Sequence, residues 1–245
     1  MPQPEKIALI GGTGLLDANW FQQARVHWEE TPHGTVTLSL GDGLCFLQRH
    51  GTHPYTPAHR VNHLAHFQAL KQAGVTRIIG VGSVGSLHTD ILPGTLVVPD
   101  DILALQVNLS FFDDARSHRP PAFDGAWRRD ILAAWQQTDL AAPLDGGVYW
   151  QTTGPRFETP AEIRFLASHA HLVGMTIASE CILAGELGIP YAAICMVDNL
   201  ANGLAEEALS YAAFKGQVQH NQEKLLRCVN ALLHQLMPAN PTPPL

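Results

Sequence analysis

The chain has few cysteines, no apolar run long enough to span a membrane and no concentration of basic residues. Its four cysteines are scattered without C-x-x-C spacing. This argues against a zinc or disulfide framework and is typical of buried thiols in a reducing compartment. Residues 1–6 lack the basic and apolar regions of a signal peptide. We therefore expect a soluble, cytoplasmic protein without a membrane partner.

Charged residues are also scarce. The 245 residues are 15% charged and 46% hydrophobic, and 15 Lys and Arg against 22 Asp and Glu give a formal net charge of −7. Because no basic stripe is present, we expect no nucleic-acid partner. No Ser/Gly-rich linker or charge run divides the chain, so we expect a single domain over residues 1–245. An anionic small substrate would need a locally built cationic pocket.

The most informative stretch is residues 154–162, Gly-Pro-Arg-Phe-Glu-Thr-Pro-Ala-Glu. Thr159 and Glu162 have the spacing of a capping box, and Pro160 suits the first helical position. A helix is therefore predicted to begin here, and the residues before Thr159 form a strand-to-helix loop.

Phe157 and Glu158 are adjacent in that loop. A flat apolar ring beside a carboxylate suits a planar heterocycle that is stacked on one face and hydrogen-bonded along one edge. Alternatively, Phe157 belongs to the hydrophobic core and Glu158 interacts with the helix dipole. The local sequence alone slightly favours this alternative.

A glycine-rich turn follows the first predicted strand. Residues 7–10 form a compact apolar strand that runs into Gly-Gly-Thr-Gly at residues 11–14. The exposed amides of this turn and the Thr13 hydroxyl suit an oxyanion. Such a turn is by itself a weak motif.

A hairpin is predicted from two strands, at residues 35–40 and 44–48, around a Gly-Asp-Gly turn. Its second strand leads into Arg49 and His50, which precede a glycine. Two cationic donors beside a glycine suit a phosphate group. Surface charges at a strand end fit the spacing equally well.

His59, His63 and His66 have the spacing of one helix face, on a helix predicted at about residues 60–74. Three histidines could bind a metal ion, but no carboxylate or cysteine lies nearby in the sequence to complete the ligand shell. We therefore expect solvated or partly buried histidines and no metal.

The β-branched strand predicted at residues 75–81 ends in Gly-x-Gly-x-x-Gly at residues 80–85. A dinucleotide fingerprint needs a helix to begin at once, whereas Pro-Gly at residues 93–94 and a new strand leave no room for one. We expect these glycines to let a ligand lie against the strand end, where Ser83 offers its amide and hydroxyl.

The chain alternates short apolar runs with amphipathic ones, and helices are predicted near residues 126–137, 178–187 and 210–236. Residues 191–197 form a nearly continuous apolar strand, as in a sheet that is covered on both faces. This strand ends in Asp198 and Asn199. Enzymes of the α/β class usually keep their chemistry at such strand ends.

These segments occur in the order found in a known enzyme family. The chain resembles the trimeric purine nucleoside phosphorylase and methylthioadenosine phosphorylase family over roughly residues 7–200, and it looks closest to the methylthioinosine phosphorylases. The motifs that carry the resemblance are residues 11–14, 49–51, 82–87, 154–162 and 174–176 and the strand end at Asn199.

The resemblance implies an α/β fold with a mixed central β-sheet flanked by helices. It also implies a homotrimer, or a multiple of it, with active sites near the subunit contacts. The reaction implied is reversible phosphorolysis of a purine nucleoside, which gives the free base and a ribose 1-phosphate. Phosphate would be a co-substrate, with no metal and no organic cofactor.

The resemblance also assigns roles to individual residues. Phosphate would be held by Thr13, Arg49, His50, Ser83 and Thr176. The base would be held by Phe157, Glu158 and Asn199, Met175 would lie against the ribose, and catalysis would rest on Asn199, Glu158 and His50. The sequence departs from the family in that His63 stands where many relatives have Tyr, and Gly82 and Ser83 replace a Thr-Ala or Asn-Ala pair.

Substrate preference follows from two positions and one segment. An ionised Glu158 can only accept, which matches the N1–H of a 6-oxopurine, and Asn199 can donate to O6. Adenosine-preferring relatives carry Asp at the Asn199 position. Relatives that use inosine place a His on the last helix, whereas residues 204–214 contain none. The apolar side chains there include Leu209, Tyr211, Ala212, Ala213 and Phe214.

We therefore predict S-methyl-5'-thioinosine as the substrate and hypoxanthine as the released base. A general phosphorylase for inosine and guanosine, or a methylthioadenosine phosphorylase, is the alternative within the family. Outside it, Arg49-His50-Gly51 resembles the motif of the histidine phosphatases, and the Gly-x-Gly-x-x-Gly segment suits a nucleotide-binding module without catalysis.

Overall fold

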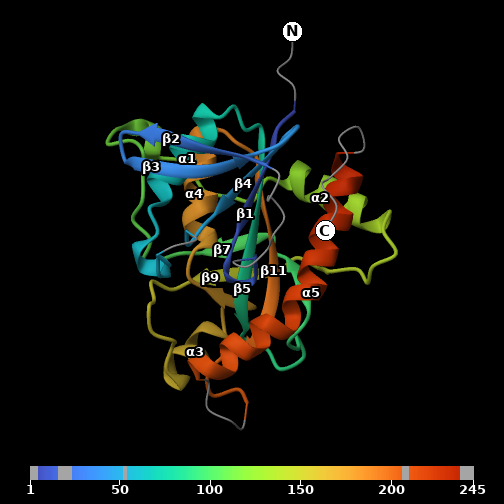
Figure 1. Cartoon of the computed structure of the whole chain (residues 1–245). Helices are drawn as coiled ribbons and strands as arrows, with labels where there is room; N and C mark the ends of the chain where they lie inside the picture. The colour runs from blue at the N-terminus through green and yellow to red at the C-terminus, as the bar shows by residue number, and fades with distance from the viewer. Residues whose placement is uncertain (1–4, 16–23, 52–53, 206–209, 238–245) are drawn as a thin grey trace.

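A computed structural model describes residues 5–15, 24–51, 54–205 and 210–237 (Figure 1). The strands are β1 (Ile7–Gly11), β2 (Arg25–Thr31), β3 (Gly34–Leu40), β4 (Leu44–Gln48), β5 (Arg77–Ser86), β6 (Leu96–Val98), β7 (Asp101–Leu103), β8 (Leu144–Asp145), β9 (Val148–Gln151), β10 (Leu172–Gly174) and β11 (Tyr191–Leu200). The helices are α1 (His63–Gln72), α2 (Gly125–Gln136), α3 (Pro160–Leu166), α4 (Ile177–Leu187) and α5 (Tyr211–Leu236), with 3-10 turns η1 (Thr13–Leu15), η2 (Ala58–Arg60) and η3 (Ala115–Ser117).

These strands form one mixed sheet with the order β2-β3-β4-β1-β5-β10-β9-β7, in which β11 pairs with β5 and with β6, and β8 pairs with β6. Strands β4, β1, β5 and β11 run parallel to one another at the centre. Every residue of β1 is buried, as expected of a central strand that is covered on both faces.

Helices cover both faces of this sheet (Figure 1). One core cluster packs α1 and α4 against the sheet, around Phe67 and Leu183. A second packs α2 and α5 against the opposite face, around Trp127 and Val229. The predicted mixed α/β architecture is confirmed. Within the described residues, no helix combines the length and apolar character needed to span a bilayer.

The helix signals in the sequence are confirmed. Thr159 and Glu162 form the predicted capping box at the start of α3, with Pro160 in the first turn. Ser210 caps α5, its side chain accepting from the Ala213 amide. The hairpin between β3 and β4 also forms as predicted.

The strand predicted at residues 75–81 corresponds to β5, and its predicted end is wrong. β5 continues through all three glycines to Ser86, because the glycines make room for side chains from neighbouring elements. A Cβ at Gly80 would collide with the Tyr191 hydroxyl, and one at Gly85 would lie 3.1 Å from Val173. No helix follows β5, so the nucleotide-binding module that this motif suggested is not supported. β11 likewise runs past its predicted end, with a bulge before Asn199.

The three histidines do not share a helix face as predicted. Asn62 caps α1, which therefore begins at His63 and leaves His59 exposed in η2. Burial lowers the pKa of His63 and His66 to about 3, so both rings are neutral at pH 7.

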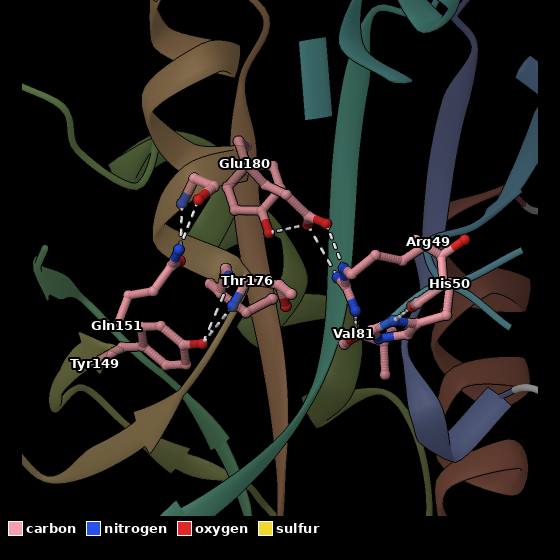
Figure 2. Close-up of polar contacts among 11 residues, drawn as sticks. Arg49, His50, Val81, Tyr149, Gln151, Thr176 and Glu180 are labelled. Carbon is pink, nitrogen blue, oxygen red and sulfur yellow. Dashed lines mark hydrogen bonds and ion pairs between the residues drawn. The ribbon is translucent and has the colours of Figure 1, made fainter. Parts of the chain in front are cut away.

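A buried ion pair joins the end of β4 to α4 (Figure 2). The Arg49 guanidinium donates to both carboxylate oxygens of Glu180, and both residues are at most 1% exposed. Tyr191 donates to Glu180 Oε2 over 2.7 Å, and Arg49 Nη1 donates to the Val81 carbonyl over 2.8 Å. The requirement for glycine at position 80 follows from this cluster, because Tyr191 and Glu180 fill the space beside it.

We expect Glu180→Gln to destabilise the fold strongly. The substitution keeps the side-chain shape but leaves Arg49 as a buried, uncompensated charge, which should lower the free energy of unfolding by about 3 to 5 kcal/mol. Urea denaturation followed by circular dichroism measures the loss. Asp130→Asn is the matched control, because it breaks a solvent-exposed pair with Arg77 and should have a much smaller effect. Equal losses in the two variants would contradict the account.

Candidate active site

One cavity of about 540 Å³ is lined by every residue to which the family resemblance assigned a role. It is lined by Thr13, Arg49, His50, Ser83, Phe157, Glu158, Met175, Thr176 and Asn199. The same cavity is also lined by Tyr55, Arg156, Tyr211 and Phe214. The fold therefore brings together segments that are far apart in the sequence.

The glycine-rich turn places Thr13 beside Arg49. The Arg49 amide donates to the Gly11 carbonyl over 2.9 Å. A Cβ on Gly12 would lie 2.5 Å from Arg49 Nη1 and 2.7 Å from the Val81 carbonyl oxygen. Glycine is needed at position 12 because the turn lies directly against the guanidinium.

Arg49 is not a free cation in this cavity. Three of its five N–H donors are used by Glu180 and the Val81 carbonyl, which leaves two for a ligand. The Glu180 carboxylate also balances its charge. Sequence reasoning missed this partner because Glu180 lies 131 residues away and no local pattern links the two.

His50 differs from the second cationic donor that we predicted. Its Nδ1 lies 2.8 Å from the Thr56 carbonyl, which can only accept, so Nδ1 carries the proton. Burial and the nearby Arg49 charge lower the pKa of His50 to about 4. At neutral pH the ring is uncharged and Nε2 is an acceptor. The ring also stacks on Tyr55, with centroids 5.1 Å apart.

The start of α4 is capped from a neighbouring strand (Figure 2). The Tyr149 hydroxyl accepts from the amides of Thr176 and Ile177 at 3.2 and 3.3 Å. Gln151 accepts from the Ser179 amide over 2.9 Å. The Thr176 side chain makes no capping bond of its own, so its hydroxyl is left for a ligand. Sequence reasoning missed Tyr149 and Gln151, because strand residues that cap a distant helix leave no local signal.

Phe157 and Glu158 line the cavity and do not belong to the hydrophobic core clusters. Glu158 is 8% exposed, and its Oε1 accepts from the Thr152 hydroxyl over 2.6 Å. In the described part of the chain Oε2 has no hydrogen-bond donor, so it remains an acceptor for a ligand. Phe157 meets Phe214 edge-on, with centroids 5.7 Å apart. The alternative in which Phe157 is a core residue is wrong.

Asn199 and Met175 complete this end of the cavity. Asn199 Nδ2 donates to the Leu200 carbonyl over 2.8 Å, which leaves its second amide hydrogen and its oxygen for a ligand. Asn202 ties this segment to the Glu158 carbonyl over 2.9 Å. Met175 lies against Gly154, where φ is +59° and a Cβ would be 2.5 Å from the sulfur.

The remaining wall is aromatic. Tyr211 and Phe214 line it as the sequence suggested, whereas Ala212 and Ala213 are exposed on α5 and do not. Leu209 lies outside the described residues. Tyr55 was missed, although its place between Pro54 and Pro57, shortly after Gly51, marks a loop close to the anion-binding segment.

Comparisons with known proteins point to one enzyme superfamily. Residues 6–234 match the sequence model described as Phosphorylase superfamily. A probable 6-oxopurine nucleoside phosphorylase of Archaeoglobus fulgidus is 37% identical, over 91% of this chain and 93% of its own length. A probable S-methyl-5'-thioinosine phosphorylase of Methanothermobacter thermautotrophicus is 36% identical, over 94% of this chain and 84% of its own.

The fold is also similar to solved structures. Methylthioadenosine phosphorylase from Schistosoma mansoni, in complex with adenine, superimposes with a TM-score of 0.82 at 25% identity, covering 97% of this chain and 93% of that one. The match to the superfamily spans almost the whole described chain, and the curated relatives exceed 30% identity. The chain belongs to the phosphorylase superfamily and is a pentosyltransferase of the purine nucleoside phosphorylase type.

Proposed function

We propose that this enzyme converts S-methyl-5'-thioinosine and phosphate to hypoxanthine and 5-methylthioribose 1-phosphate. The observation that carries the proposal is the pair formed by Glu158 and Asn199 at one end of the cavity. Among the residues that the structure describes, none donates to the second carboxylate oxygen of Glu158, and one amide hydrogen of Asn199 is unused.

This pair suits a 6-oxopurine. The N1–H of hypoxanthine is a donor that matches Glu158 Oε2, and O6 is an acceptor that matches the Asn199 amide. Adenine has an acceptor at N1, which would face the Glu158 carboxylate and leave it without a donor. A buried polar group left without a partner costs roughly 1 to 3 kcal/mol, so adenine nucleosides should be poor substrates.

The chemistry needs an anion at one end and an electron sink at the other. As the C1′–N9 bond breaks, its electron pair leaves with the base, and a phosphate oxygen forms the new bond to C1′. The proton that hydrogen phosphate gives up balances the proton that the base takes up. Asn199 and Glu158 stabilise the charge developing on the purine, while Arg49, Thr13 and Thr176 donate to phosphate. His50 lines the same cavity, where its neutral ring adds no charge. The proposal requires no covalent nucleophile, metal or organic cofactor.

The sugar end favours a methylthio group. Tyr211 and Phe214 present aromatic surface to the cavity, and sulfur packs well against aromatic rings. Two relatives carry names as probable S-methyl-5'-thioinosine phosphorylases, from Methanothermobacter thermautotrophicus and Xanthomonas campestris, at 36% and 34% identity. The relatives named as 6-oxopurine nucleoside phosphorylases support the same base and leave inosine as the alternative substrate.

We expect kcat/KM to be largest for methylthioinosine, smaller for inosine and smallest for methylthioadenosine, by about tenfold or more at each step. Steady-state assays on these three nucleosides and adenosine, with phosphate in excess, measure the order. A larger value for methylthioadenosine would contradict the Glu158 and Asn199 argument. A larger value for inosine would contradict the argument from the aromatic wall.

Asn199→Asp tests the base argument on the same substrates. A carboxylate at this position accepts from the N6 amino group and repels O6, so the ratio of 6-amino to 6-oxo activity should rise about tenfold or more. Asn108→Asp is the matched control, because it adds the same charge at a residue that does not line the cavity. Equal loss on all substrates would mean that Asn199 does not read the base edge.

We also propose a homotrimer or a multiple of it. Leu105 and Phe165 are 76% and 58% exposed, beside a second cavity of about 590 Å³ that shares Arg156 and Glu158 with the first. Exposed apolar side chains grouped in this way favour contact with another subunit. The four free cysteines are buried, which supports a cytoplasmic location. The single-domain organisation over residues 1–245 stays a prediction.

Light scattering should give three times the chain mass or a multiple of it. Leu105→Asp should dissociate the assembly and lower kcat/KM, because the second cavity adjoins the base-binding end. Leu92→Asp is the matched control, because Leu92 is also an exposed leucine, at 58%, but lines neither cavity. It should leave the assembly and kcat/KM unchanged. A fully active monomer would contradict the proposal.

A further inference from the structure

Ser83 bonds to a buried acid that the proposed reaction does not use. Ser83 lies on β5 and lines the cavity, and its hydroxyl donates to Asp198 Oδ2. Asp198 is 2% exposed on β11, which runs parallel to β5. The pairing of these two central strands holds the serine and the acid side by side.

Both oxygens of Asp198 are occupied. Asn221 on α5 donates its Nδ2 hydrogen to Asp198 Oδ1 over 2.8 Å, while Ser83 donates to Oδ2. The Asn221 orientation is itself supported by Gln217, which donates to its oxygen over 3.3 Å. An ionised carboxylate has no hydrogen to give. The single hydroxyl hydrogen of Ser83 is therefore committed to Asp198, and the serine oxygen can offer only lone pairs to the cavity.

We propose that Ser83, oriented by Asp198, accepts a hydrogen bond from the proton of hydrogen phosphate and so selects phosphate over sulfate. This inference rests on the proposed function, because it assigns Ser83 to the phosphate end of the site. Sulfate matches phosphate in size and shape but carries no proton at neutral pH. Its oxygen would meet the serine lone pairs without a hydrogen between them, which is repulsive.

The other residues that would hold phosphate are consistent with this role of Ser83. Arg49, Thr13 and Thr176 offer donors, which suit the deprotonated oxygens of phosphate and sulfate equally. Arg49 is balanced by Glu180 and His50 is neutral, so net charge gives little discrimination between two dianions. Selectivity then depends on the direction of individual hydrogen bonds. Ser83 is a selectivity residue that contacts the anion, and Asp198 is a positioning residue that acts only through it.

Asp198→Asn reverses the direction of the hydrogen bond between residue 198 and Ser83. The amide has nearly the same shape as the carboxylate that it replaces. The amide oxygen still accepts from Asn221, and the new amide nitrogen donates to the serine oxygen, so the hydroxyl hydrogen turns toward the cavity. Isothermal titration with inorganic phosphate and with sulfate at pH 8 gives the two dissociation constants. Burial raises the pKa of Asp198, and a pH above neutral favours its ionised form.

The unaltered enzyme should bind phosphate at least about tenfold more tightly than sulfate, and Asp198→Asn should lower that ratio about tenfold, mainly by tighter sulfate binding. Ser83→Ala should also lower the ratio, because it removes both the acceptor and the repulsion. If Asp198→Asn does not fold, Ser83→Ala alone tests whether Ser83 selects phosphate over sulfate. Ser86→Ala is the matched control on the same strand, because that hydroxyl bonds to the His88 carbonyl and does not line the cavity.

An unchanged ratio in either folded variant, or equal weakening of both anions, would overturn the inference. So would an unaltered enzyme that binds the two anions equally. If the enzyme gives any of these binding results but still catalyses phosphorolysis, the proposed function is not contradicted. Absence of phosphate binding in the unaltered enzyme would overturn both.

Discussion

The buried pair of Arg49 and Glu180 is the interaction on which the site depends. It fixes the end of β4 against α4, and the Tyr191 hydroxyl extends it to β11. A guanidinium taken out of water is tolerated only beside its carboxylate, so neither residue is replaceable alone. The pair also explains why two glycines are needed: Gly12 leaves room for the guanidinium, and Gly80 leaves room for Glu180 and Tyr191.

One consequence is that the phosphate end of the cavity has little uncompensated charge. Arg49 is balanced and His50 is neutral, so an anion is held by the direction of donors and acceptors. The same principle applies at the base end, where no described residue donates to the second carboxylate oxygen of Glu158. Selectivity at both ends then follows from which ligand atoms carry hydrogen. This accounts for discrimination between ligands of nearly equal size, which apolar packing alone cannot provide.

The sequence predicted the elements that have strong local signals. The capping box at Thr159, the hairpin before Arg49 and the apolar run of β11 depend on neighbouring residues, and all three form. It also predicted which residues would gather in one cavity, because ordered motifs resemble a known family. It did not predict the continuation of β5 to Ser86 or the partners of Arg49, Thr176 and Ser83. These depend on Tyr191, Glu180, Tyr149 and Asp198, which are distant in the chain and meet only through the sheet.

In the proposed reaction phosphate, not water, takes the sugar. Phosphorus NMR of the enzyme with methylthioinosine and phosphate tests it most directly, with hypoxanthine followed by absorbance in the same sample. We expect a new sugar 1-phosphate signal that grows in step with hypoxanthine, and no base release when phosphate is left out. Release of hypoxanthine at the same rate without phosphate, or without a new phosphorus signal, would contradict it.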